Sequence, residues 1–159
     1  MTKDQGTVWA QLLLAHGRIT DRIDRDLTAQ CEMTLAEYEV LEHLATADGQ
    51  TLRMNELADR VRLSPSGLTR RFDTLVRRGW VTREPCSDDR RGINAAATAK
   101  GMQKFRSATG VHGRGVQDYL IANLDAGELA CLATALGRLA EANAGDRLTA
   151  SSAPRAAAS

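Results

Sequence analysis

The sequence has few aromatic residues, with two each of Trp, Tyr and Phe among 159 residues. A hydrophobic core must therefore be built from Leu, Ala, Val and Ile, which is typical of helix-rich proteins. No apolar run approaches the roughly 20 residues that cross a bilayer, and the N-terminal region has no secretory apolar segment. These absences predict a soluble protein that stays in the cytoplasm and does not bind a membrane.

Cysteine is also scarce. Cys31, Cys86 and Cys131 are odd in number and show no CxxC spacing, which argues against both a disulfide framework and a zinc site. The histidines are scattered, and the sequence has no H-E-x-x-H, no G-x-S-x-G and no glycine-rich phosphate loop. We therefore expect no metal, no cofactor and no enzymatic activity. Cys31 and Cys131 are expected to be buried.

The positive charge is concentrated in one part of the chain. From Arg53 to Arg91 the sequence has ten arginines and six carboxylates, a local net charge of +4, whereas the whole chain carries +1. The remaining segments are therefore net acidic. A concentrated basic segment in a nearly neutral chain indicates contact with a polyanion such as nucleic acid.

An amphipathic helix is expected to begin within this basic segment. Ser64 is placed to cap it, and Pro65 takes the first helical position, where its missing N–H costs nothing. Gly79 ends the helix. The apolar stripe consists of Leu68, Phe72, Leu75 and Val76. The opposite side consists of Ser66, Thr69, Arg70, Asp73 and Arg77, a combination suited to base edges, although an ordinary solvated basic face is the alternative.

A two-stranded β-hairpin is expected after this helix. Trp80, Val81 and Thr82 favour a strand, residues 87–89 favour a turn, and Ile93 restarts an extended run. Upstream, the apolar spacing from Met54 to Val61 predicts a short helix joined to the next by a tight turn. Helix, turn, helix and hairpin together form the winged helix-turn-helix plan.

The hairpin tip carries Arg90 and Arg91 beside Gly92. Two guanidinium groups on a loop are suited to a narrow, electronegative minor groove. Asp89 is expected to hold one of them in place by a salt bridge.

The run LTRRFDTLVRRGWVTREPCSDDRRG, residues 68–92, resembles the recognition helix and wing of the MarR (multiple antibiotic resistance regulator) family. In that family the helix reads LTR, then D and L, followed by a G-W/L-V-x-R strand and a wing that closes on D-R/K-R. The resemblance covers roughly residues 8 to 143. The element after the wing reads Ala97-Thr98-Ala99-Lys100-Gly101, with alanine where the family usually has leucine.

The resemblance implies a mainly α fold with a small β-hairpin wing, in which a winged helix-turn-helix lobe is joined to a helical dimerisation region. It also implies a homodimer that binds double-stranded DNA at an inverted-repeat operator, with half-sites about 10 bp apart. Proteins of this family commonly repress transcription until a small ligand, often phenolic or an aromatic carboxylate, binds them. The resulting expectation is a ligand-responsive repressor. There are two alternatives: a redox-responsive regulator that acts through Cys86, and a helical adaptor that does not bind DNA.

The remaining chain is expected to form helices for assembly. A first helix runs from near Thr7 to Cys31, a long helix from Thr98 to about Asn123 bends at its glycines, and a last helix starts at Asp125. The last helix carries a coiled-coil-like leucine seam that needs a partner. The expected regions are an N-terminal dimerisation helix (1–33), the DNA-binding lobe (34–97), C-terminal dimerisation helices (98–144) and a disordered tail (145–159).

Candidate site residues follow from this docking plan. Those expected to contact DNA are Ser64, Ser66, Thr69, Arg70, Arg71, Arg77, Arg90 and Arg91. In detail, Ser66, Thr69 and Arg70 are assigned to the major groove, Arg71 and Arg77 to phosphates, and Arg91, with Arg90 as second choice, to the minor groove. The candidate ligand-binding residues are Trp9, His16, Arg18 and Asp73. For Trp9 a core or dimer-interface position is the alternative, and Asp73 matches an aspartate that takes part in ligand sensing in some urate-responsive members.

Overall fold

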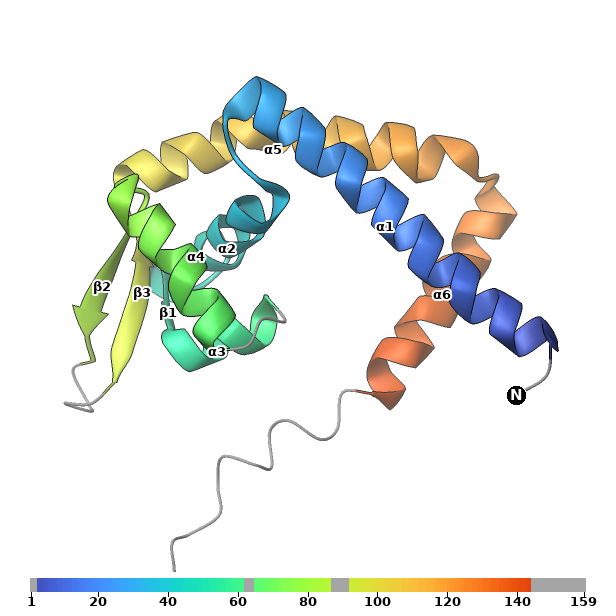
Figure 1. Ribbon diagram of the computed structural model, residues 1–159, viewed down its shortest axis with the longest axis horizontal. Helices are drawn as coiled ribbons and strands as arrows, with labels where there is room; N and C mark the ends of the chain where they lie inside the picture. Colours follow the sequence, from blue (N-terminus) through green and yellow to red (C-terminus); the bar gives the residue numbers. More distant parts are fainter. Residues whose placement is uncertain (1–2, 62–64, 87–91, 144–159) are drawn as a thin grey trace, which may run out of the picture. The chain divides into compact units, whose positions relative to one another are not determined.

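The computed structural model describes residues 3–61, 65–86 and 92–143, which divide between Leu120 and Ile121 into two units. The first unit contains five α-helices, one 3-10 helix and a small sheet within the described ranges (Figure 1). In chain order its elements are α1 (Lys3–Cys31), α2 (Leu35–Ala45), η1 (Asp48–Gln50), β1 (Thr51–Arg53), α3 (Met54–Arg60), α4 (Pro65–Arg77), β2 (Val81–Pro85), β3 (Ile93–Ala97) and α5 (Ala99–Tyr119). The second unit contains η2 (Ile121–Asn123) and α6 (Ala126–Ala142). The predicted mainly α fold with a β-hairpin wing is confirmed.

The sheet has one strand more than the predicted hairpin. It is antiparallel with the order β1-β3-β2, so that β3 lies between the other two strands. Leu52 of β1 pairs with Ala95, and Arg83 of β2 pairs with the same residue from the other side. The sequence did not predict β1, because a strand of three residues is too short to show the period-2 alternation of apolar and polar side chains.

The core lies where the helices of the first unit meet the sheet. Leu68, Phe72 and Leu75 of α4 are buried, as the predicted apolar stripe requires. They pack in one cluster with buried side chains of α1, α2, α3 and the sheet, including Leu27 and Tyr38. Burial of these aliphatic and aromatic side chains fixes the orientation of α4, so that its polar side is turned away from the core.

Helix α1 changes character along its length. In its C-terminal half Ile23 and Leu27 are buried, and this half packs against α5. The Tyr119 hydroxyl of α5 donates a hydrogen bond to Asp26 Oδ2 at 2.6 Å, and this bond raises the pKa of the Tyr119 phenol, so it stays protonated at neutral pH. The exposed large apolar residues of the N-terminal half are Val8, Trp9, Leu12, Leu13 and Leu14. Within the first unit the apolar residues of α1 are therefore buried only in its C-terminal half.

The sequence predicted a bend or break at the glycines of the long helix, and a break is excluded because α5 is continuous from Ala99 to Tyr119. Its glycines allow close packing instead: Gly101 lies against the Trp80 backbone, and Gly115 lies against Ile23 of α1. Contacts with α1 and α2 stabilise the helix despite its low intrinsic propensity, since tertiary packing outweighs propensity.

Helix α6 of the second unit is exposed along its length. Its start is as predicted, with a capping box between Asp125 and Glu128. Cys131 is exposed, so the prediction that it is buried is wrong, whereas Cys31 is buried as expected. Leu136 and Leu139 of the leucine seam are also exposed. Taken singly, none of the described helices is long and apolar enough to cross a membrane.

Candidate nucleic-acid interface

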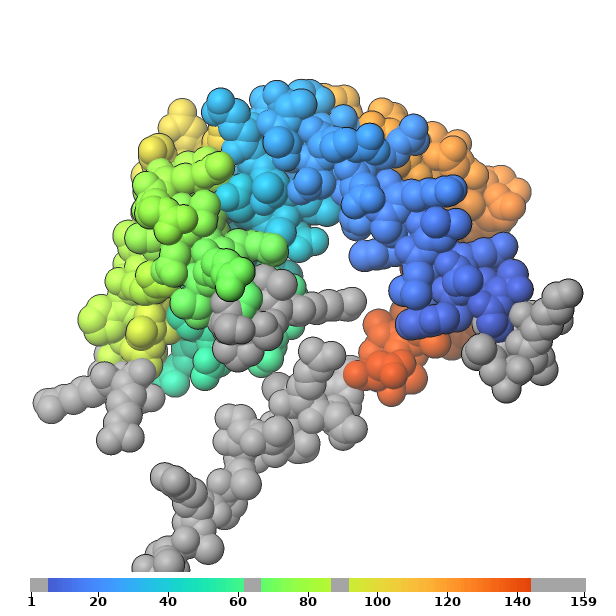
Figure 2. Space-filling model, in the orientation of Figure 1, coloured from blue at the N-terminus to red at the C-terminus, as the bar shows by residue number. Residues whose placement is uncertain are grey.

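The polar side of α4 is presented to solvent. Thr69 and Arg70 are exposed and Arg71 is half-buried, on the side opposite the buried stripe. Figure 2 shows α4, in green, on the surface of its unit. Ser66 belongs to this helix by its backbone, whereas the predicted site residues Ser64, Asp89, Arg90 and Arg91 lie outside the described residues. An exposed helix with short hydroxyl and guanidinium side chains is chemically suited to reading base edges.

An ion pair joins this helix to the wing. Arg83 Nη2 of β2 lies 2.6 Å from Asp73 Oδ1 of α4, and the Arg83 guanidinium lies 5.3 Å from the centre of the Phe72 ring. Thr69 and Arg83 also line one groove of about 340 Å³ together with Gly92 at the base of β3. The ion pair joins β2 to α4 and so contributes to the position of the wing relative to this helix.

Sequence reasoning missed Arg83 as a site residue. It placed the wing's charge at the tip and assigned its support to Asp89. The available signal was the arginine that ends the G-W/L-V-x-R strand pattern, which is Arg83 in this sequence. Its partner was not readable, because the structure places Arg83 opposite Ala95, where β2 contacts α4. Strand alternation alone does not tell which face of a short strand meets a helix.

We predict that Asp73→Ala weakens binding to operator DNA by about three- to tenfold. The wing loses its ion pair to α4, so DNA binding must also supply the free energy that orders the wing. The effect on the free energy of unfolding stays within about 1 kcal/mol, since both side chains of this surface pair are partly exposed. DNA titration and thermal melting measure the two quantities. Asp59→Ala is the matched control, because it removes an exposed carboxylate from the same lobe without breaking an ion pair. Equal DNA affinities of the two variants would contradict this role of the ion pair.

The C-terminal end of α4 is held by three other elements. Gly79 adopts the left-handed region with φ of 71°, which turns the chain from helix to strand. Lys100 Nζ of α5 donates to the Arg78 carbonyl oxygen at 2.8 Å. Arg78 Nη1 donates to the Glu32 carbonyl oxygen at the end of α1 at 2.7 Å and lies 3.5 Å from Glu37 Oε2 of α2. The recognition helix is therefore anchored at one end and clamped to the wing along its side.

The candidate ligand residues are not brought together. Trp9 and His16 are exposed on α1, and Asp73 is paired with Arg83 in the DNA-reading lobe. Arg18 lines a groove of about 560 Å³ between α1 and the end of α5. Its other charged or aromatic lining residues are Asp21, Arg22, Arg25 and Tyr119. This groove, rather than the predicted set, is where α1 gathers guanidinium groups.

Cys86 lies at the end of β2 and is half-buried. Its thiol donates a hydrogen bond to Asn94 Oδ1 at 2.9 Å, and its backbone N–H donates to the Gly92 carbonyl at 3.0 Å. These contacts show a thiol built into the base of the wing. The redox hypothesis for Cys86 stays a prediction.

A short helix, an exposed basic helix and a β-hairpin wing that is ion-paired to it define a winged helix-turn-helix DNA-binding protein. The sequence model described as the MarR family matches residues 32–92. The multiple antibiotic resistance protein MarR of Escherichia coli strain K12 is 30% identical over 112 residues, which are 70% of this chain and 76% of that protein. The chain belongs to the MarR family of transcriptional regulators.

Solved structures agree with this assignment. AbsC, a MarR family transcriptional regulator from Streptomyces coelicolor, superposes with a TM-score of 0.83 at 29% identity, covering 92% of this chain and 98% of AbsC. Sco3205, a MarR family regulator from the same organism solved in complex with DNA, has a TM-score of 0.83 at 29% identity and 89% coverage of both chains. The predicted family and fold are both confirmed.

Proposed function

We propose that the protein is a dimeric repressor that binds an inverted-repeat operator in double-stranded DNA. The observation that carries the proposal is the geometry of α4, whose exposed Thr69 and Arg70 stand on a helix clamped to the wing by Asp73 and Arg83. Rigid support matters because base recognition requires side chains held in register with the groove. The DNA complex of Sco3205 supports the same use of this fold.

In the proposed complex each recognition helix enters a major groove. Thr69 and Arg70, with Ser66, contact base edges, and Arg70 has the fork geometry that suits guanine. Arg71 and Arg77 contact phosphates, which position the protein without reading sequence. Arg90 and Arg91 extend into the flanking minor groove, where A·T-rich DNA is narrow and electronegative.

The exposed apolar residues support the dimer. Val8, Trp9 and Leu12 to Leu14 on α1, together with Leu136 and Leu139 on α6, leave large side chains in water. Apolar surface of this extent is typical of interfaces between subunits. We assign residues 1–33 and 98–144 to dimerisation and 34–97 to DNA reading. A two-fold axis between two copies then requires a target with two-fold symmetry.

The proposal is tested by fluorescence-anisotropy titration of the purified protein against the intergenic DNA upstream of its own coding region, at two salt concentrations. We expect preference over scrambled DNA, a steep loss of affinity at higher salt because phosphate contacts release counterions, and a stoichiometry of two chains per site. Light scattering of the free protein should give a dimer. A monomer in light scattering, or equal salt-insensitive binding to both DNAs, would contradict the proposal. A reporter gene under the bound promoter then distinguishes repression, which lowers expression, from activation.

We further propose that a small aromatic or phenolic anion releases the repressor and binds in the groove lined by Arg18. The guanidinium groups of Arg18, Arg22 and Arg25 supply charge for a carboxylate or phenolate, and Tyr119 supplies an aromatic wall. The Arg22 guanidinium already lies 4.8 Å from the centre of the Tyr119 ring. The volume of about 560 Å³ fits a small ligand.

Salicylate and benzoate are suitable probes of this groove. In wild-type protein we expect either probe to lower operator affinity, whereas Arg18→Ala should require about tenfold more ligand for the same release, since it loses a charge-assisted hydrogen bond. Arg138→Ala on α6 is the control for loss of an exposed cation outside the groove. Identical release curves for Arg18→Ala and Arg138→Ala would place the ligand elsewhere.

A further inference from the structure

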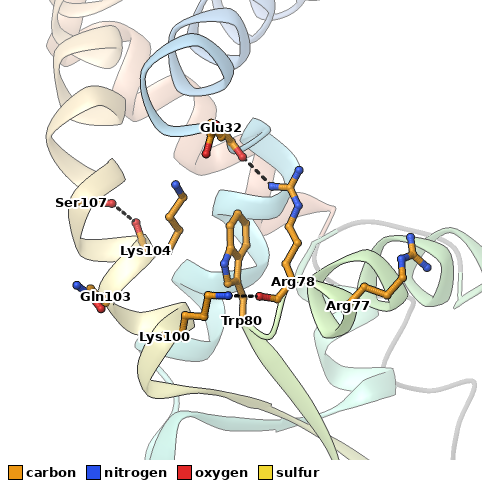
Figure 3. A pocket seen from close by; sticks show the side chains of 8 residues that line it. All are labelled: Glu32, Arg77, Arg78, Trp80, Lys100, Gln103, Lys104 and Ser107. Carbon is orange, nitrogen blue, oxygen red and sulfur yellow. Dashed lines mark hydrogen bonds between the residues drawn. The ribbon is translucent and has the colours of Figure 1, made fainter.

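A second groove, here called the basic groove, lies between the start of α5 and the end of α4 and has a volume of about 760 Å³ (Figure 3). Its α5 wall consists of Lys100, Gln103, Lys104 and Ser107, which recur at helical spacing on one face. The opposite wall consists of Arg77 and Arg78 from the end of α4 and Glu32 from the end of α1. Trp80 stands between the two walls. The groove belongs entirely to the first unit and lies apart from the exposed Thr69 and Arg70.

Donors outnumber acceptors in the basic groove. Four cations face one carboxylate, and the hydrogen bond that Glu32 accepts from Arg78 goes to its backbone carbonyl oxygen. Within the described residues the Lys104 ammonium and the Gln103 side-chain amide have no hydrogen-bond partner. Lys100 donates one of its three N–H groups, to the Arg78 carbonyl. Several donors are thus available to a bound molecule.

The position of the lysines adds to this positive potential. Lys100 and Lys104 lie in the first two turns of α5, where the helix macrodipole already carries partial positive charge, and the first turn contains no acidic residue. Cations at this end are unfavourable for the helix itself. Lys104 Nζ is held 5.6 Å from the centre of the Trp80 ring, and the Arg78 guanidinium lies 4.8 Å from the same ring. Two cations therefore lie beside the Trp80 indole ring, in a groove that contains little negative charge.

We propose that the basic groove binds a small polyanionic metabolite, a molecule that carries at least two phosphate or carboxylate groups. Its volume lies within the range of about 300–1,000 Å³ found for small-ligand sites. Trp80 is only 6% exposed, so the groove offers no open aromatic face to a phenol or a nucleobase. Recognition rests on charge-assisted hydrogen bonds, for which the Arg78 guanidinium provides a planar fork and Lys104 a point charge. This chemistry differs from that of the aromatic anion proposed for the Arg18 groove.

The location gives such a ligand access to the anchor of the recognition helix. Arg78, which lines the groove, is the residue that joins the end of α4 to the Glu32 carbonyl and to Glu37. Lys100 holds the same end of α4 through the Arg78 carbonyl. A bound anion therefore contacts the side chains that fix α4 to α1, α2 and α5.

Isothermal titration calorimetry of the DNA-free protein at low ionic strength tests the proposal, with pyrophosphate and citrate as the two probes. We expect one site per chain for at least one probe. Lys104→Gln and Lys100→Gln should each weaken its binding by at least about tenfold, because each loses a charge-assisted contact. Two matched controls should stay within about twofold: Arg106→Gln, on α5 outside the groove, and Arg70→Gln, on the DNA-reading side of α4.

Three results would overturn the assignment. The first is no binding of either probe to wild-type protein. The second is an equal loss in Arg70→Gln, which would show that the anions bind the DNA-reading surface. The third is tighter binding of a hexaglutamate peptide than of both probes at matched ionic strength, which would assign the basic groove to an acidic protein segment. Thermal melting of every variant shows whether its fold is intact, and Lys100→Gln remains informative if Lys104→Gln disturbs the packing around Trp80.

Discussion

Replacement of Arg70 by alanine is expected to lower the free energy of operator binding by about 1 to 3 kcal/mol in each half-site and to relax the preference for one base pair. Arg70 is exposed, and within the described residues it takes part in no hydrogen bond or ion pair. The substitution therefore removes a contact to DNA without removing a contact within the protein. Since a dimer carries two copies, the losses add to about 2 to 6 kcal/mol, and the loss in affinity for the whole operator is roughly thirtyfold to ten-thousandfold.

Arg106→Ala is the matched control for this measurement. Arg106 is also exposed, on α5, and its loss changes the net charge of the chain by the same amount. Anisotropy titrations of both variants against the operator, and against operators altered at one base pair, separate general electrostatic attraction from base reading. If Arg70→Ala and Arg106→Ala bind equally well, Arg70 does not read a base and α4 is docked in another register.

Replacement of Gly101 by alanine is expected to destabilise the fold by about 3 kcal/mol or more. A Cβ atom at this position would overlap the Trp80 carbonyl oxygen and lie 2.8 Å from the carbonyl carbon. That backbone has little freedom to move, because the Trp80 carbonyl accepts a hydrogen bond from Thr98 N at 3.0 Å and the Trp80 side chain is buried. The start of α5 would have to move away from the sheet, which also disturbs the anchor of α4.

Gly113→Ala is the control, and its expected effect on the free energy of unfolding has the opposite sign. It lies in the same helix, and a Cβ atom there would have no other atom within 4 Å. Alanine at this position should stabilise the protein by about 0.5–1 kcal/mol, because glycine loses more conformational freedom in a helix. Chemical denaturation measures both values. A Gly101→Ala variant as stable as the wild type would show that α5 and the sheet tolerate separation.

Several features of the fold follow from residues close together in the sequence. The stripe of Leu68, Phe72 and Leu75 predicted which side of α4 is buried. The start of α6 at Asp125 and the left-handed Gly79 that ends the recognition helix were equally readable. Each depends on interactions within about one turn of helix, so local sequence contains all the information required.

Other features depended on contacts between distant residues. The continuity of α5 through Gly115 comes from packing against Ile23, and the exposure of Cys131 on α6 is known only from the folded chain. Neither is visible in the periodicity of a single helix. A pattern shows that a face is apolar, but not what covers it.

By itself the sequence determined the family, the winged helix and the exposed face of α4, because motif, periodicity and capping are local or nearly so. Only the tertiary structure decided which charges meet. It paired Asp73 with Arg83, joined Arg78 to Glu32 across the lobe and gathered the α5 lysines around Trp80. The Arg78 contacts join residues more than 40 positions apart, and side chains at such separations are brought together by the packing of helices and sheet rather than by any local preference.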